Sequence, residues 1–210
     1  MPTVLTLQSL PLFPLNTVLF PGGLLPLRVF EVRYLDMIGR CQRAGAPFGV
    51  VCLTQGNEVR QPGSKEAFCS VGTLATITDF DNPQPGLMII RASGTQRFRI
   101  TSRDQLKHGL WIADVQRLPA DQSVPLPSDL QHTADALRKL IDSLQQRNGP
   151  EGQLPLQGPW RLDDCGWVAN RWCELLPLPT EMKQRLMELD NPLVRLELVS
   201  DVLARTGITG

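Results

Sequence analysis

The segment from Leu10 to Ile38, LPLFPLNTVLFPGGLLPLRVFEVRYLDMI, is almost wholly apolar for its first two thirds, yet prolines at positions 11, 14, 21 and 26 interrupt it. A membrane-spanning helix needs about 20 consecutive apolar residues, and proline in a helix interior removes a hydrogen bond and clashes with the preceding turn. No basic residue precedes Arg28, so the positive region of a signal peptide is also missing. The segment must therefore be buried in a folded domain, and we expect a cytoplasmic protein with no membrane association.

The composition of the 210 residues is typical of a globular protein, with 42% hydrophobic and 20% charged residues. Lys plus Arg equals Asp plus Glu at 21 each, so the net charge provides no general attraction to nucleic acid or to an anionic membrane. The five cysteines are odd in number, widely spaced and without a CxxC motif. This pattern disfavours a disulfide framework and a zinc site, and we expect buried thiols in a reducing compartment.

Residues 1–118 read as β-rich, because short apolar runs alternate with turn signals. The opening is divided into three short strands that end at Asn16–Thr17, at Pro21–Gly23 and at Phe30, and Pro26 places the third at a sheet edge or bulge. Tyr34, Met37, Ile38 and Cys41 then have helical spacing, which predicts a helix ended by Gly45. Further strands are expected in FGVVCL, FCSVGTLATITDF, GLMIIRAS, QRFRI and GLWIADVQRL, with turns at Asp79–Asp81 and at Gly94.

The pattern changes at residues 119–127, PADQSVPLP, which we interpret as a linker. From Ser128 onward the signals are helical, and Ser128 with Gln131 has the form of a capping box. Three shorter helices are predicted to begin near Asp163–Asp164, at Thr180 as N-cap, and at Asn191 with Pro192 in the first turn. The fold class is therefore α+β, with a β-rich subdomain (1–118) that contains one inserted helix and a small helical bundle (128–210).

No group of residues indicates catalysis, a cofactor or a metal. The two histidines, His108 and His132, are isolated, and neither GxSxG nor GxxxxGK[ST] occurs. Arginines surround Phe98 in RASGTQRFRITSR, but strand alternation would place Arg97 and Arg99 on one face and Phe98 in the core. That arrangement is typical of a half-exposed strand, and it makes nucleic-acid binding the weaker interpretation.

The opening segment, followed in order by VGTLATITDF, LMIIRASGTQRFRI, WIADVQRL and LPLPTEMKQRLMELDNPLVRLELVSDVL, resembles the N-terminal substrate-binding domain of Lon-type ATP-dependent proteases. The resemblance covers nearly the whole chain. The sequence ends at Gly210 with no Walker motif and no Ser–Lys peptidase segment, so it is most similar to the free-standing bacterial proteins with this domain. In those proteins IFEPRY is common where this chain has VFEVRY (29–34), with valine in place of proline.

The resemblance implies a PUA-like pseudo-barrel followed by helices, and a non-catalytic role in binding unfolded or exposed polypeptide segments. A similar domain in cereblon acts as a scaffold in degradation machinery, so a protease or chaperone is an expected partner, and a homodimer remains open. Arginine and tyrosine are enriched at binding hot spots, which makes the charged turn the candidate site. Its residues are Arg28, Phe30, Glu31, Arg33, Tyr34 and Met37.

Two kinds of alternative stay open at this point. For the turn itself, Glu31 and Arg33 would pair or cap the following helix, and Phe30 and Tyr34 would belong to the core. For the whole chain, the alternatives are a stand-alone hydrolase or peptidase with an unrecognised site, and an RNA-binding barrel.

Overall fold

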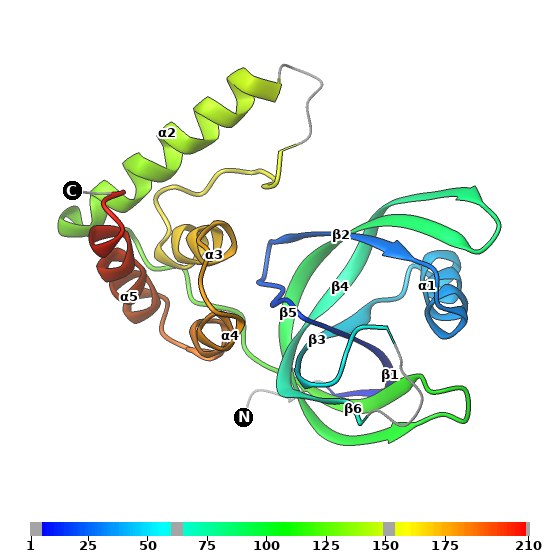
Figure 1. The fold of residues 1–210 in the computed structure, drawn as a ribbon. Helices are drawn as coiled ribbons and strands as arrows, with labels where there is room; N and C mark the ends of the chain where they lie inside the picture. Colours follow the sequence, from blue (N-terminus) through cyan, green and yellow to red (C-terminus); the bar gives the residue numbers. More distant parts are fainter. Residues whose placement is uncertain (1–5, 60–64, 149–153, 209–210) are drawn as a thin grey trace. The chain divides into compact units, whose positions relative to one another are not determined.

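In the computed structural model, the described residues are 6–59, 65–148 and 154–208. The chain divides into two compact units, Met1–Ala120 and Asp121–Gly210. The boundary falls inside the segment that the sequence predicts as a linker; the strands and one helix precede it in the chain, and the remaining helices follow it (Figure 1).

In the described part of the first unit, six strands form one sheet in the order β2-β5-β4-β3-β1-β6. Since β5 also pairs with β6, the sheet closes on itself, and β2 remains an edge strand that pairs with β5 alone. The predicted pseudo-barrel with one inserted helix is confirmed, as is the edge position of Pro26. The elements are β1 (Thr6–Leu15), β2 (Leu24–Val29), α1 (Val32–Ala44), β3 (Phe48–Gln55), β4 (Ala67–Gln84), β5 (Leu87–Gln105) and β6 (Trp111–Arg117).

Helix α1 covers part of the core of this unit, and its sequence explains both its face and its end. The residues with helical spacing, Tyr34, Met37, Ile38 and Cys41, are all buried. Gly45 adopts a left-handed conformation (φ 59°), which glycine tolerates without steric cost. The predicted helix is therefore confirmed at its buried face and at its last residue.

Three local predictions in this unit are wrong. Val18–Phe20 is buried but is not a strand. Asp79–Asp81 lies within β4, and the turn falls at Pro85–Gly86, where Gly86 has φ 81°. Gly94 is not a turn, because β5 runs through it without a break. At this glycine the backbone of the loop between β1 and β2 approaches β5 closely, and the Gly22 N–H donates to the Gly94 carbonyl at 2.8 Å.

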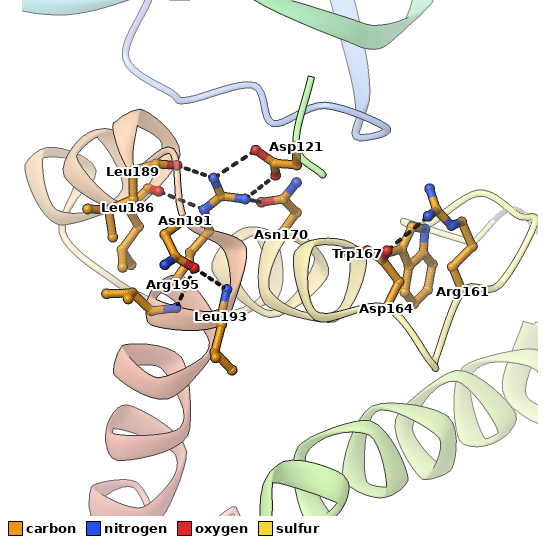
Figure 2. A network of polar contacts seen from close by, with 11 residues as sticks. Asp121, Arg161, Asp164, Trp167, Asn170, Leu186, Leu189, Asn191, Leu193 and Arg195 are labelled. Atoms are coloured by element: carbon orange, nitrogen blue, oxygen red, sulfur yellow. Dashed lines mark hydrogen bonds and ion pairs between the residues drawn. The ribbon is translucent and has the colours of Figure 1, made fainter. Parts of the chain in front are cut away.

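The second unit is helical in its described residues, as predicted, and two of its helix starts follow the sequence. Asp164 accepts a hydrogen bond from the Trp167 N–H at 2.8 Å, and Asn191 accepts one from the Leu193 N–H at 3.0 Å (Figure 2). The elements are η1 (Ser128–Leu130), α2 (Gln131–Asn148), α3 (Cys165–Leu175), α4 (Thr180–Glu188) and α5 (Pro192–Arg205).

Two predicted caps in this unit are not formed. Pro127, not Ser128, occupies the cap position of the short helix η1, and Pro179, not Thr180, precedes α4. At neither start does a capping side chain accept a hydrogen bond from a backbone N–H. Each helix therefore starts one residue earlier than predicted, and the proline at the cap position has no side-chain oxygen that could accept from the first backbone N–H groups.

Candidate functional site

A cavity of about 250 Å³ lies beside the end of β2 in the first unit. Most of its lining is apolar, and three charged side chains, Arg28, Glu31 and Glu58, stand among the lining residues. Phe30 and Val59 are 55% and 49% exposed, which leaves apolar surface open at the cavity. The remaining lining residues are Phe13, Leu15, Pro26, Leu27, Val29 and Tyr34.

The cavity brings together four of the six residues that the sequence predicts as a site. Arg28, Phe30, Glu31 and Tyr34 line it, with Arg28 and Phe30 exposed. Arg33 and Met37 are buried and are not among the lining residues. The charged turn is therefore divided between residues that line the cavity and buried residues behind it that hold the start of α1.

Arg33 is held in a buried polar network. Its Nη2 donates to Glu66 Oε1 at 3.0 Å, its Nη1 to the Gly109 carbonyl at 2.9 Å, and its Nε to Glu31 Oε2 at 3.1 Å. Glu66 also accepts from the indole N–H of Trp111 at 2.8 Å. Burial disfavours the charged guanidinium, but the hydrogen bond to Glu66 and the nearby carboxylates outweigh it, and the pKa of Arg33 lies above its ordinary value. Arg33 therefore joins α1 to the start of β4 and to the turn before β6.

Tyr34 forms the floor of the cavity. Its ring stacks on Phe13, with centroids 4.0 Å apart, and the guanidinium of Arg33 lies 4.5 Å from its ring centroid. Burial raises the pKa of the Tyr34 phenol well above its ordinary value, although the charge of Arg33 acts in the opposite direction. The side chain thus stays neutral and provides a flat, mostly apolar surface.

The lining residues that were not predicted as part of the site are Phe13, Leu15, Pro26, Leu27, Val29, Glu58 and Val59. Phe13 and Leu15 belong to the apolar opening segment, which was expected only to be buried, and their strand meets α1 through long-range packing that the sequence does not reveal. Glu58 and Val59 lie in a polar loop. The sign in the sequence that could have marked this loop as part of the site is Val59, an apolar residue among polar neighbours. Glu58 is positioned by the Asn16 N–H, which donates to its carboxylate at 2.6 Å.

Two wider hollows lie on the helical unit, one of about 550 Å³ between α4 and α5 and one of about 680 Å³ beside α2. The second includes His132, whose ring nitrogens lie 3.0 Å from the Asp129 carbonyl and from Ser200 Oγ. Ser200 lies inside helix α5, where backbone N–H groups are engaged in the helix and provide no oxyanion hole. We take the β2 cavity as the candidate site, because it combines exposed apolar side chains with a sheet edge.

Other kinds of site receive no support from the described residues. Within 6–59, 65–148 and 154–208, no three His, Cys, Asp or Glu side chains are placed to hold a metal ion. Burial raises the pKa of the thiols of Cys41, Cys52 and Cys173, the last to about 12, so they are poor nucleophiles. Phe98 lies in the core, as expected, and the register from Arg97 to Arg99 has no shift, so the two arginines share the other face, where Arg97 is buried and Arg99 is exposed.

The fold and the matched family place the chain among Lon N-terminal domains. It belongs to the ATP-dependent protease La (LON) substrate-binding domain family, which matches residues 9–205. A crystal structure of a Lon N-terminal domain protein from Xanthomonas campestris has a TM-score of 0.71 and 32% identity, over 93% of this chain and 98% of that one. The N-terminal domain of Mycobacterium avium complex Lon protease shares the fold (TM-score 0.58, 19% identity, 92% of this chain and 97% of that one).

Full-length Lon proteases are also similar. The Lon proteases of Paraburkholderia phytofirmans and Anaeromyxobacter dehalogenans are 28% and 26% identical, over 90% and 93% of this chain. The chain spans only 23% of the length of each. None of the helices in the described segments is long and apolar enough to cross a membrane.

Proposed function

We propose that this chain is a non-catalytic module that binds unfolded or exposed polypeptide segments at the β2 cavity. One observation carries the proposal: a chain of a substrate-binding family has an apolar cavity with exposed Phe30 and Val59 beside it. Exposed apolar side chains around a concave surface are the usual means of holding apolar groups that a folded protein would bury.

Within this site, the six predicted residues have two roles. Arg28, Phe30, Glu31 and Tyr34 contact the polypeptide directly. Arg33 and Met37 hold the start of α1, so that Tyr34 and Glu31 keep their places. This division is supported by the cavity lining, which includes the first four residues and neither Arg33 nor Met37.

The wider setting is part of the same proposal. We place the protein in the cytoplasm, where buried thiols stay reduced; Cys41, Cys52, Cys165 and Cys173 are buried, and no disulfide is formed among the described residues. A protease or a chaperone would receive the bound segment, as the membership of a Lon substrate-binding family suggests. A homodimer is compatible with this role.

The test is a binding titration with fluorescein-labelled, reduced and alkylated casein, followed by anisotropy. We expect saturable binding, and we expect Phe30→Ala to raise Kd at least fivefold, since it removes the largest exposed apolar side chain at the cavity. Val194→Ala is the control: Val194 is an exposed apolar residue, 38% accessible, on a helix of the other unit. Absence of saturable binding, or equal effects of the two substitutions, would contradict the proposal.

The non-catalytic part has its own test. The purified protein is incubated with casein, with and without ATP, and the products are separated by electrophoresis. We expect intact casein in both. Cleavage that a single Ser, Lys or Cys substitution abolishes would overturn the proposal in favour of a hydrolase.

A further inference from the structure

The cavity at β2 follows the edge of the strand, not one of its faces. Four consecutive residues, Pro26, Leu27, Arg28 and Val29, line it. Successive side chains of a strand point to opposite faces, so a cavity that is lined by four residues in a row must run along the backbone edge between them. In the described chain, β2 pairs with β5 alone, so this edge has no strand beside it.

The direction of the free backbone groups can be deduced from the start of the strand. The Gly94 N–H donates to the Gly23 carbonyl at 2.9 Å, so the carbonyl of Gly23 points toward β5. Peptide groups alternate in direction along an antiparallel strand, and the register from Leu24 to Val29 has no shift. The N–H and carbonyl of Arg28 therefore point away from β5, as does the carbonyl of Pro26, which has no N–H to leave unpaired.

The two faces of β2 differ in chemistry. Leu25 and Val29 are buried, and Leu27 packs against the core of the barrel together with Phe13 and Tyr34. Pro26 and Arg28 are exposed on the other face. Among the described residues the guanidinium of Arg28 has no ion-pair partner, whereas Glu31 is paired with Arg33. Glu58, the third charged residue of the lining, accepts a hydrogen bond from the Asn16 N–H. Arg28 is thus the cation at this edge, and it lies on the outer face.

We propose that the polypeptide binds as an added strand along the free edge of β2, with an acidic residue opposite Arg28 and large apolar residues on either side of it. This proposal rests on the proposed function and specifies its substrate class. The residue paired with Arg28 shares its face, so its carboxylate meets the guanidinium. The peptide residues on either side of the acidic one point to the opposite, inner face of the strand, and their side chains enter the cavity over Tyr34. Addition of a strand to a sheet edge is a general mode of peptide recognition, in which main-chain hydrogen bonds give affinity and pockets for alternate side chains give specificity.

The first test uses the wild-type protein and a fluorescein-labelled nine-residue peptide with phenylalanine, glutamate and valine at its centre and serine and glycine at its ends. A second peptide carries N-methyl groups on the backbone nitrogens of the glutamate and of the residue after the valine, whose N–H groups would face the carbonyls of Arg28 and Pro26. We expect saturable binding of the first peptide and at least tenfold weaker binding of the second, which has lost its strand-forming donors. A third peptide, with lysine in place of glutamate, should bind roughly fivefold more weakly, because it meets Arg28 with a like charge.

The second test separates the side chain of Arg28 from its backbone. Arg28→Ala removes the charge but keeps the outward N–H, whereas Arg28→Pro removes both and leaves the bonds to β5 in place. Arg28→Ala should abolish the preference for glutamate over lysine, and Arg28→Pro should weaken both peptides a further fivefold or more. Circular dichroism and thermal unfolding establish that both variants fold, and the N-methylated peptide tests the pairing on the unaltered protein.

The outcomes distinguish the two levels of the proposal. If unfolded casein binds and Phe30→Ala weakens it, but the N-methylated peptide binds as well as its parent, the strand addition is wrong while the polypeptide-binding function stands. If neither casein nor the peptides bind, both are wrong. If the peptides bind with no preference between glutamate and lysine, the assigned role of Arg28 is wrong.

Discussion

The carbonyl oxygen of Phe20 lies against the backbone of Gly94, so closely that a Cβ added at position 94 would be 2.3 Å from it. Real Cβ atoms do not approach an oxygen so closely. Hydrogen bonds on both sides hold the contact: Gly22 N–H donates to the Gly94 carbonyl at 2.8 Å, and Gly94 N–H donates to Gly23 at 2.9 Å. Because glycine has no side chain, the backbone of the loop at Phe20 can pack directly against the backbone of β5 at this position.

Replacement of Gly94 by alanine should therefore destabilise the barrel. Because the colliding atom is backbone and cannot rotate away, we expect the free energy of unfolding to fall by about 3 kcal/mol, the upper part of the range for overpacked sites. Urea denaturation followed by circular dichroism measures it. Gly39→Ala is the control: the nearest atom to its added Cβ is the flexible Arg43 Nη1 at 3.4 Å, and alanine in a helix should be neutral or stabilising by up to about 1 kcal/mol. A loss below 1 kcal/mol for Gly94→Ala would show that the loop moves aside.

A buried arginine, Arg195, organises the helical unit (Figure 2). Its side chain is only 1% exposed and donates to the Leu186 and Leu189 carbonyls, to the Asn170 amide oxygen and to the Asp121 carboxylate. A lysine cannot reach four acceptors that are arranged around a planar guanidinium. We expect Arg195→Lys to lower the free energy of unfolding of this unit by about 3 kcal/mol, because it leaves buried acceptors unpaired.

The matched control is the exposed pair of Arg185 with Glu181, on α4. Their side chains are 78% and 77% exposed, and their contact of 2.6 Å spans one helical turn. Exposed ion pairs contribute little, so Arg185→Ala should change the free energy of unfolding by less than about 0.5 kcal/mol. Comparable losses in Arg195→Lys and Arg185→Ala would show that burial of Arg195 does not make its contacts important.

Much of the fold could be predicted from local patterns. The spacing of Tyr34, Ile38 and Cys41 gave the buried face of α1, and Pro192 after Asn191 gave the start of α5, since both depend on neighbours within a few residues. Gly94 could not be assigned in the same way. Glycine between two apolar runs usually indicates a turn. Here Gly94 lies in the middle of a strand, and the reason for a glycine is the close approach of the distant loop at Phe20.

The candidate site was predictable as a segment but not residue by residue. Phe30 and Arg33 are three positions apart, yet one is exposed and the other buried. The difference is set by Glu66 and Gly109, which lie 33 and 76 positions beyond Arg33 and provide its acceptors. A single sequence contains no local sign of such pairings, so it could not separate a residue that lines the cavity from one that is buried behind it.

Glu174 should make the stability of the helical unit depend on pH. Burial raises its pKa to about 7, although the guanidinium of Arg171, 2.9 Å away, acts in the opposite direction. In the unfolded chain, the pKa of a glutamate side chain is about 4.3. Between these values the native state binds more protons than the unfolded state, so the free energy of unfolding falls as the pH rises from 5 through 7. The size of this contribution is on the order of 2 kcal/mol.

Glu174→Gln should remove that contribution. Urea denaturation of both proteins at pH 5 and pH 8 gives the comparison, in which other titrating groups cancel. We expect the wild type to lose more stability than the variant between the two pH values. Identical losses would mean that the carboxylate stays charged in the native state, with Arg171 outweighing its burial.

The pair of Arg33 with Glu66 should be important for the fold and only indirectly for binding. Their side chains are 4% and 5% exposed, so removal of one partner leaves the other charge buried. We expect Arg33→Met and Glu66→Gln each to lower the free energy of unfolding by about 3 kcal/mol, and the double variant to lose about 2 kcal/mol less than the sum. A double-mutant cycle by urea denaturation measures the coupling. Casein binding by Arg33→Met, at a temperature where the variant is fully folded, should weaken by less than the roughly fivefold expected for Phe30→Ala, because Arg33 does not line the cavity and acts only by holding Glu31 and Tyr34 in place. A large loss of binding in folded Arg33→Met would instead assign Arg33 to the binding surface.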